Sequence, residues 1–232
     1  MSLFASLFPI LCWLAYNLLV PVVERRRPSL SVIMSMQRRR WVANATRRES
    51  PMDAILSGNL MQSVSLLAST SVLLILAIFA AFGQIPALMD SLETLGLATG
   101  HRQIDLQIHL LVMLAIFVSS FFAFTLSLRQ FNHFCIMVGA IDHSAPASED
   151  EIDAIASLNS LAAKNFNSGI RAYYFSVPAV AWFASDALAI VTTVVTAGFI
   201  IHREFFSSAH RVAASVAVIA SRREKQRQDA NH

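Results

Sequence analysis

Long apolar runs constrain this chain more than any other feature of its sequence. Four stretches, at residues 2–23, 60–83, 105–128 and 177–201, consist almost entirely of apolar side chains. An α-helix needs about 20 such residues to cross the hydrocarbon core of a bilayer. We therefore expect an all-α, polytopic membrane protein: a four-helix transmembrane bundle with cytoplasmic helical extensions, forming a single membrane domain over residues 1–232.

The composition favours membrane spans over a soluble core. Hydrophobic residues make up 55% of the chain and charged residues 14%, whereas soluble domains carry about 25% charged residues. The net charge of +3 comes from arginines beside the apolar runs, which favours anionic lipid headgroups as partners and argues against nucleic acid. Cys12 and Cys135 match neither a disulfide framework nor a metal-ligand spacing.

The most basic part of the chain follows the first apolar run. Eight arginines lie between residues 24 and 63: Arg25, Arg26, Arg27, Arg38, Arg39, Arg40, Arg47 and Arg48. Basic residues gather in cytoplasmic loops, so loops 24–59 and 129–176 are expected on the cytoplasmic side of a bacterial inner membrane. A short surface helix here, with Trp41 at the interface, would bring Arg25–Arg27 and Arg38–Arg40 to lipid headgroups. The alternative is a solvated loop that only fixes topology.

Two capping patterns predict where helices begin. Ser50-Pro51-Met52-Asp53 should start a helix that runs to about Phe82 and projects into the cytoplasm. Ser148-Glu149-Asp150-Glu151 should start a cytoplasmic amphipathic helix over residues 149–164. We also expect an amphipathic tail helix over residues 203–221, a disordered end over residues 222–232, and both chain termini on the outer side.

Polar residues inside the expected spans suggest two special faces. Gly58, Gln62, Ser65 and Ser69 share one side of the second span, a pattern typical of close helix packing; the alternative is a solvated substrate path. Asp186 falls within the fourth expected span, where a charged side chain costs ~2.5–3.5 kcal/mol. We expect Asp186 to face the bundle, either in a structural helix contact or as a proton or cation site.

The most specific motif lies between residues 165 and 183. It reads Asn167-Ser168-Gly169-Ile170-Arg171-Ala172-Tyr173-Tyr174-Phe175, followed by Trp182-Phe183. The paired tyrosines are typical of a headgroup layer. Arg40-Trp41 and Asp53-Ala54 precede this motif, and Arg203-Glu204-Phe205 follow it. In this order the motifs resemble the DUF599 family, membrane proteins of unknown function from bacteria and plants. The resemblance covers most of the chain and implies no activity, substrate or catalytic residue.

No enzyme motif is persuasive. The chain has no His-Glu-x-x-His, Cys-x-x-Cys or glycine-rich phosphate loop, and His133, Cys135, Asp142 and His143 are interpreted as a chance cluster on a polar helix extension rather than a metal site. We expect no metal and no cofactor.

The best interpretation is a noncatalytic scaffold or accessory membrane component that associates with a second copy or with another membrane protein. One alternative is a transporter or oligomeric channel with a polar interior around Asp186. Another is a lipid-headgroup enzyme at the inner rim, using Arg129, His133 and Arg171. The structural or functional candidates are Asn167, Gly169, Arg171, Tyr173, Tyr174, Trp182, Asp186, Arg129 and His133.

Overall fold

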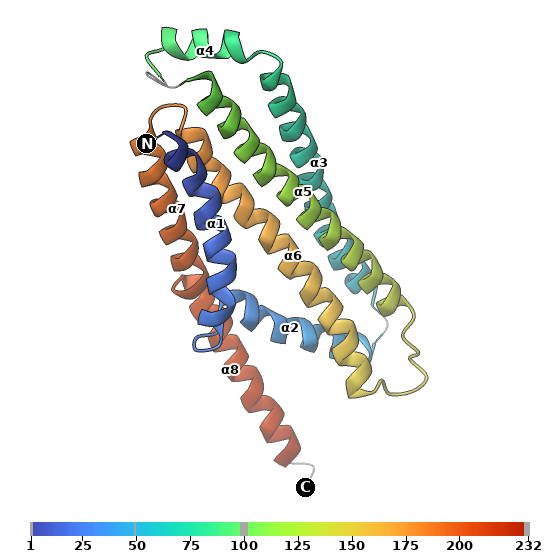
Figure 1. The fold of residues 1–232 in the computed structure, drawn as a ribbon. Coiled ribbons are helices and arrows are strands. Elements are labelled where there is room, and N and C mark those ends of the chain that lie inside the picture. Colours follow the sequence, from blue (N-terminus) through green and yellow to red (C-terminus); the bar gives the residue numbers. More distant parts are fainter. Residues whose placement is uncertain (1, 49, 98–101, 230–232) are drawn as a thin grey trace.

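The computed structural model describes residues 2–48, 50–97 and 102–229, and the regular elements among these residues are all helices. In chain order they are α1 (Ser2–Glu24), α2 (Leu30–Ala45), α3 (Pro51–Phe82), α4 (Ile85–Thr94), α5 (Gln103–Gly139), α6 (Glu149–Ala181), α7 (Asp186–Phe205) and α8 (Ser208–Asp229) (Figure 1). The all-α prediction is confirmed.

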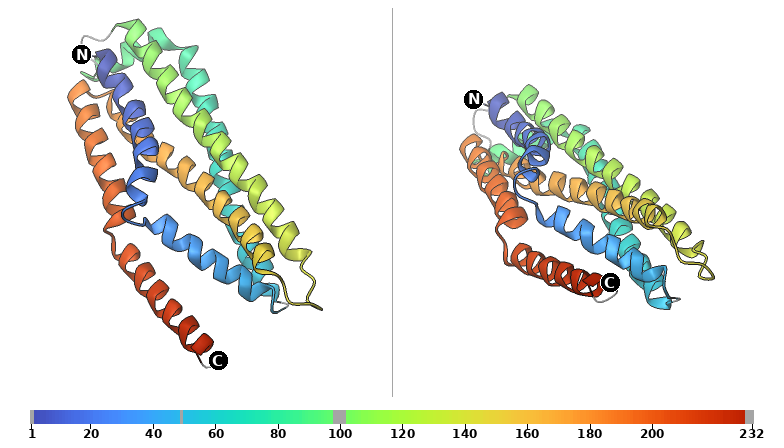
Figure 2. Two further views of the ribbon diagram at one scale, coloured as in Figure 1. Left: turned by 60° about the horizontal axis from the view of Figure 1, so that its bottom comes forward. Right: turned by 90° about the horizontal axis from the view of Figure 1, so that it is seen from below.

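The long helices α1, α3, α5, α6 and α7 run between two ends of an elongated bundle (Figures 1 and 2). One end, called here the α4 end, carries the start of α1, helix α4 and the turn between α6 and α7. The other, the α2 end, carries α2, α8 and the connection between α5 and α6. The most extensive packing joins α5 to α6, and α3 to α5.

Within the described part of the chain, four helical segments are long and apolar enough to cross a membrane: Leu3–Glu24, Pro51–Phe82, Gln103–Gly139 and Asp186–Arg223. The number of such segments equals the predicted four, and the first three lie where the sequence indicates. The more polar helix α6 also runs from one end of the bundle to the other (Figure 1). With 32 residues, α3 extends about 48 Å, which is longer than a hydrocarbon core of ~30 Å.

The predicted fourth span, residues 177–201, is wrong as a single helix. Helix α6 ends at Ala181 and α7 begins at Asp186. The Ser185 hydroxyl accepts a hydrogen bond from the Leu188 amide at 3.1 Å, and Asp186 lies in the first turn of α7, where a carboxylate complements the helix dipole. This capping signal interrupts an apolar run that otherwise looks continuous.

The break changes the path of the chain on both sides of it. Residues 165–176, expected to be a cytoplasmic approach, lie in the second half of α6, which begins at Glu149 beside the predicted Ser148 cap. Helix α7 returns to the α2 end, so α8 lies at the opposite end of the molecule from the start of α1 (Figure 1). The expectation that both termini share one side is therefore wrong.

Helix α8 also runs further than expected. It continues to Asp229, past residue 221, because the arginine, lysine, glutamate and glutamine residues that follow are favourable in helices. The expected disordered end at 222–232 is thus helical up to Asp229, and residues 230–232 lie outside the described residues.

Candidate functional site

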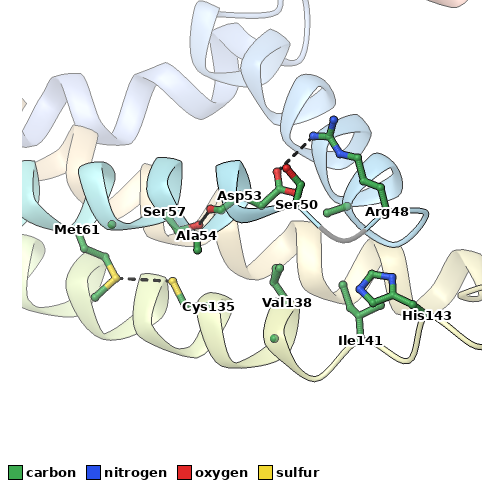
Figure 3. A pocket seen from close by; sticks show the side chains of 13 residues that line it. Arg48, Ser50, Asp53, Ala54, Ser57, Met61, Cys135, Val138, Ile141 and His143 are labelled. Atoms are coloured by element: carbon green, nitrogen blue, oxygen red, sulfur yellow. Dashed lines mark hydrogen bonds and ion pairs between the residues drawn. The ribbon is translucent and has the colours of Figure 1, made fainter.

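A pocket of about 570 Å³ lies at the α2 end, between the first turns of α3 and the last turns of α5 (Figure 3). Met61 and Cys135 form its apolar base, with their sulfur atoms 3.7 Å apart. Arg48 and His143, from the connections that follow α2 and α5, lie at its rim (Figure 3). A pocket with an apolar base and a cationic and an imidazole group at its rim is better suited to binding an amphipathic ligand or a partner segment than to catalysis.

Asp53 is the best-anchored polar residue of this pocket. Its carboxylate accepts a hydrogen bond from Trp41 Nε1 at 2.6 Å and lies 3.5 Å from Arg48 Nη2. Its backbone carbonyl accepts from the Ser57 hydroxyl at 2.8 Å, and the residue is only 5% exposed. The Ser50 cap of α3 forms as expected, through the Met52 amide. Asp53 thus joins α2 to α3.

Arg171 lies in the interior of the bundle, where α6 meets α1 and α7. Its Nη2 atom is 3.5 Å from Glu204 Oε1, and both side chains are 15% exposed. Its guanidinium also lies 5.2 Å from the centre of the Tyr16 ring. Removing one member of such a buried pair leaves an uncompensated charge, which costs about 3–5 kcal/mol. Arg171 therefore ties three helices together.

The two tyrosines that follow Arg171 point to different neighbours. The Tyr173 hydroxyl donates to the Leu67 carbonyl at 3.0 Å and lies 2.7 Å from Ser71 Oγ, so Tyr173 fixes α6 against α3 inside the bundle. The Tyr174 hydroxyl accepts a hydrogen bond from Arg203 on α7. At the N-terminal end of the same motif, the Asn167 side-chain amide donates a hydrogen bond to the Ser31 hydroxyl on α2 at 3.2 Å.

Gly169 allows α6 to approach α5 closely. A Cβ atom at this position would lie 2.5 Å from Cε1 of Phe124, a ring that is completely buried. The Ser120 hydroxyl of α5 donates to the Gly169 carbonyl at 3.4 Å. Only glycine fits here without moving the phenyl ring, because real side-chain atoms do not approach one another so closely.

His109 is the residue whose importance the sequence analysis missed. Its Nε2 atom lies 2.7 Å from the Ala179 carbonyl and its Nδ1 atom 2.7 Å from Ser6 Oγ. Since a carbonyl only accepts, we assign the proton to Nε2, and the Ser6 hydroxyl donates to Nδ1. The ring stacks on Trp182 at 4.1 Å. The available signal was a polar residue inside an apolar span, which requires a polar partner.

The Ser6–His109 pair has the residue types of a nucleophile and its base, but it is closed to solvent. Ser6 is 1% exposed and His109 is completely buried. Both imidazole nitrogens are engaged, and the hydrogen bonds connect α1, α5 and the end of α6. The pair therefore joins helices at the α4 end.

The structure does not bring together the residues expected for a transporter around Asp186 or for a lipid-headgroup enzyme. Asp186 was expected within a span, but it begins α7 at the α4 end, partly exposed. Arg129 and His133 are exposed on α5, whereas Arg171 contacts Glu204 and Tyr16. Among the residues described, no group of three His, Cys, Asp or Glu side chains could hold a metal ion.

The arginines expected at lipid headgroups divide into two sets. Arg25, Arg26 and Arg27 are exposed just beyond α1. On α2, the side chains of Arg38 and Arg39 turn to the protein: burial lowers the pKa of Arg38, and hydrogen bonds to Asp153 and Glu149 raise the pKa of Arg39. Trp41 also packs inward, 5.5 Å from the ring of Phe134.

These features define a helical, multi-pass membrane protein in which the polar residues of the sequence motifs connect helices to one another. The chain belongs to the family described as "Protein of unknown function, DUF599", which matches residues 4–209. No curated protein and no solved structure matches it.

Proposed function

We propose that this protein is a noncatalytic membrane scaffold or accessory component. The observation that carries the proposal is that the polar residues of the sequence motifs bond to other helices of the same chain. The pairs are Trp41 with Asp53, Asn167 with Ser31, Arg171 with Glu204, Tyr173 with Ser71, and Tyr174 with Arg203. Such contacts hold the helices in position, which is a structural use of these polar groups.

We further propose that the α2 end faces the cytoplasm of a bacterial cell, with the protein in the inner membrane. The proposal is supported by charge: the arginines that follow α1 and those of α8 lie at this same end, because α7 runs back toward it. The described part of the α4 end carries Asp90, Glu93 and Asp105 with Arg102. Positively charged residues concentrate on the cytoplasmic side of membrane proteins.

This orientation is tested by labelling single cysteines in a protein whose Cys12 and Cys135 have been replaced. Ser50→Cys and Ser148→Cys should react with a membrane-impermeant maleimide only after the cells are opened. Ser91→Cys, on α4, should react in intact cells. The opposite pattern would reverse the orientation.

The scaffold proposal is tested on the Arg171–Glu204 pair. Arg171→Gln and Glu204→Gln should each lower the membrane abundance and the unfolding temperature in detergent, because each leaves a buried charge alone. The double variant Arg171→Gln/Glu204→Gln should regain most of both, because it contains no unpaired charge. In all three variants, the degree to which the protein restores growth of a deletion strain should rise and fall with its abundance in the membrane.

A double variant that regains abundance without restoring growth would contradict a scaffold, because the charges would then be needed for something other than folding. Asp186→Asn serves as the companion test. A scaffold should tolerate it at full abundance, whereas a proton-coupled transporter built on Asp186 should lose complementation.

A further inference from the structure

An apolar groove of about 480 Å³ lies between α1 and α7. Its walls come from residues such as Leu19 and Val23 on α1 and Ala197 and Ile201 on α7. Among the residues that the structure describes, Arg27 is the only charged one that lines it. Its volume is within the range of small-molecule sites, about 300–1,000 Å³. With almost no polar group along its walls, the groove does not suit a water-soluble ligand.

The groove runs along α1 and is about as long as one membrane leaflet is thick. Along α1 its lining begins at Cys12, near the middle of the helix, and ends beyond the helix at Arg27. The 12–23 part alone covers roughly 17 Å at 1.5 Å per residue, close to half of a ~30 Å hydrocarbon core. The groove therefore runs from the bundle centre to the α2 end, with the cation at its mouth.

Arg27 is held at this mouth in a way that leaves it able to bind an anion. Its guanidinium carbon lies 4.3 Å from the centre of the Phe206 ring. Stacking on an aromatic ring uses the flat face of a guanidinium, so the N–H groups in its plane remain available to donate to a phosphate.

The charges around the mouth are mostly positive. Arg25 and Arg26 are exposed beside Arg27. The nearby carboxylates are Glu24, which accepts a hydrogen bond from the Ser29 hydroxyl at 2.5 Å and keeps its negative charge, and Glu204, which pairs with Arg171. Three arginines therefore outnumber the one unneutralised carboxylate. An anionic group at the end of the groove would meet arginines with little competition from acidic side chains.

We propose that this groove is a binding site for a phospholipid with an anionic headgroup, drawn from the leaflet at the α2 end. One acyl chain lies along the apolar walls, and the phosphate accepts hydrogen bonds from Arg27. This site differs from an ordinary lipid-facing surface such as Val195, which is 64% exposed, because it is a groove that ends at an arginine. The proposal does not depend on the scaffold function.

The test is native mass spectrometry of the full-length protein in detergent, with phosphatidylglycerol or phosphatidylcholine of identical acyl chains. The wild type should retain one phosphatidylglycerol molecule in preference to phosphatidylcholine. Arg27→Gln should weaken phosphatidylglycerol binding about fivefold, the effect expected of one arginine near a lipid phosphate, and should remove the preference. Arg222→Gln, on the exposed part of α8, is the matched charge control and should bind as the wild type does.

Filling the groove tests the acyl-chain part of the proposal. Ala197→Phe should reduce binding of both lipids at least tenfold, whereas Val195→Phe, on the exposed side of α7, should leave binding unchanged. Ala15→Phe fills the groove from the α1 side and replaces Ala197→Phe in this experiment if the Ala197→Phe protein does not fold. Equal binding of the two lipids by the wild type, or equal binding by the groove-filling and control variants, would overturn the proposal.

Discussion

The contact between α5 and α6, called here the α5–α6 seam, contains the same kinds of residue as the outer face of α3, which is formed by Gly58, Gln62, Ser65 and Ser69. The seam is closely packed, whereas these four residues are exposed. On the seam, Gly169 lies against the Phe124 ring and Ser127 donates to the Ala162 carbonyl at 2.7 Å. On α3, a Cβ atom at Gly58 would meet nothing within 4 Å, and Ser65 is exposed.

This difference shows that small and polar residues at helical spacing do not by themselves identify a packed face. The stripe of Gly58, Gln62, Ser65 and Ser69 was predicted to pack against another helix, and within the described chain that prediction is wrong. Close packing also needs a partner of matching shape, which Phe124 supplies for Gly169 and nothing in the described chain supplies for Gly58.

The largest effect is expected at His109, at one end of the seam. His109→Phe keeps an aromatic ring against Trp182 but leaves the buried Ser6 hydroxyl without its partner, at roughly 1–3 kcal/mol. It also removes the imidazole hydrogen bond to the Ala179 carbonyl, worth about 1 kcal/mol, and leaves that carbonyl only the Trp182 amide at 3.3 Å. Thermal unfolding in detergent measures the loss. His133→Phe, at an exposed position of the same helix, should change the unfolding temperature little; equal losses in both variants would mean that the seam does not depend on these hydrogen bonds.

The two glycines test the comparison directly. Gly169→Ala should destabilise the protein by about 1–3 kcal/mol, because the added methyl group overlaps the buried Phe124 ring. Gly58→Ala should be neutral or stabilising by up to ~1 kcal/mol, since alanine is the better helix former and the space is open. Unfolding of the two variants in one detergent measures both. A stable Gly169→Ala protein would show that the seam tolerates wider spacing.

A smaller difference is expected between two serines. Ser127→Ala removes an interhelical hydrogen bond and should cost about 0.6 kcal/mol, the average for such bonds in membrane proteins. Ser65→Ala removes a hydroxyl for which no interhelical bond is seen among the described residues, so the unfolding free energy should not change. Chemical denaturation of both variants is sensitive enough to rank them, and a larger loss at Ser65 would reverse the ranking.

The smallest effect is expected at Gln62 on the outer face of α3. Gln62→Leu should alter the unfolding free energy by less than ~0.5 kcal/mol, as exposed substitutions usually do. A marked loss of stability, together with disulfide cross-linking of Ser65→Cys between copies in membranes, would show that a second copy covers this face. The difference in packing between the outer face of α3 and the α5–α6 seam would then exist only within a single chain and not in the oligomer.

The candidate site was predictable in its residues but not in its pairings. The motifs around Trp41, Asp53, Arg171 and Arg203 were visible in the sequence, yet nothing in it joins Trp41 to Asp53 or Arg171 to Glu204. The break before Asp186 was readable from the Ser185 cap, but the length of the apolar run outweighed it. His109 could have been identified from the sequence only by noting that a histidine inside an apolar span needs hydrogen-bond partners on other helices.

By itself, the sequence determined the features that depend on neighbouring residues. Apolar run length determined the helical membrane class, and the serines before α3 and α6 determined where those helices begin. Only the tertiary structure decided which of two similar glycines is packed, where the chain turns back at α7, and which arginine lies at the groove. These depend on the tilt and rotation of each helix, which are set by its neighbours across the bundle and not by its own residues.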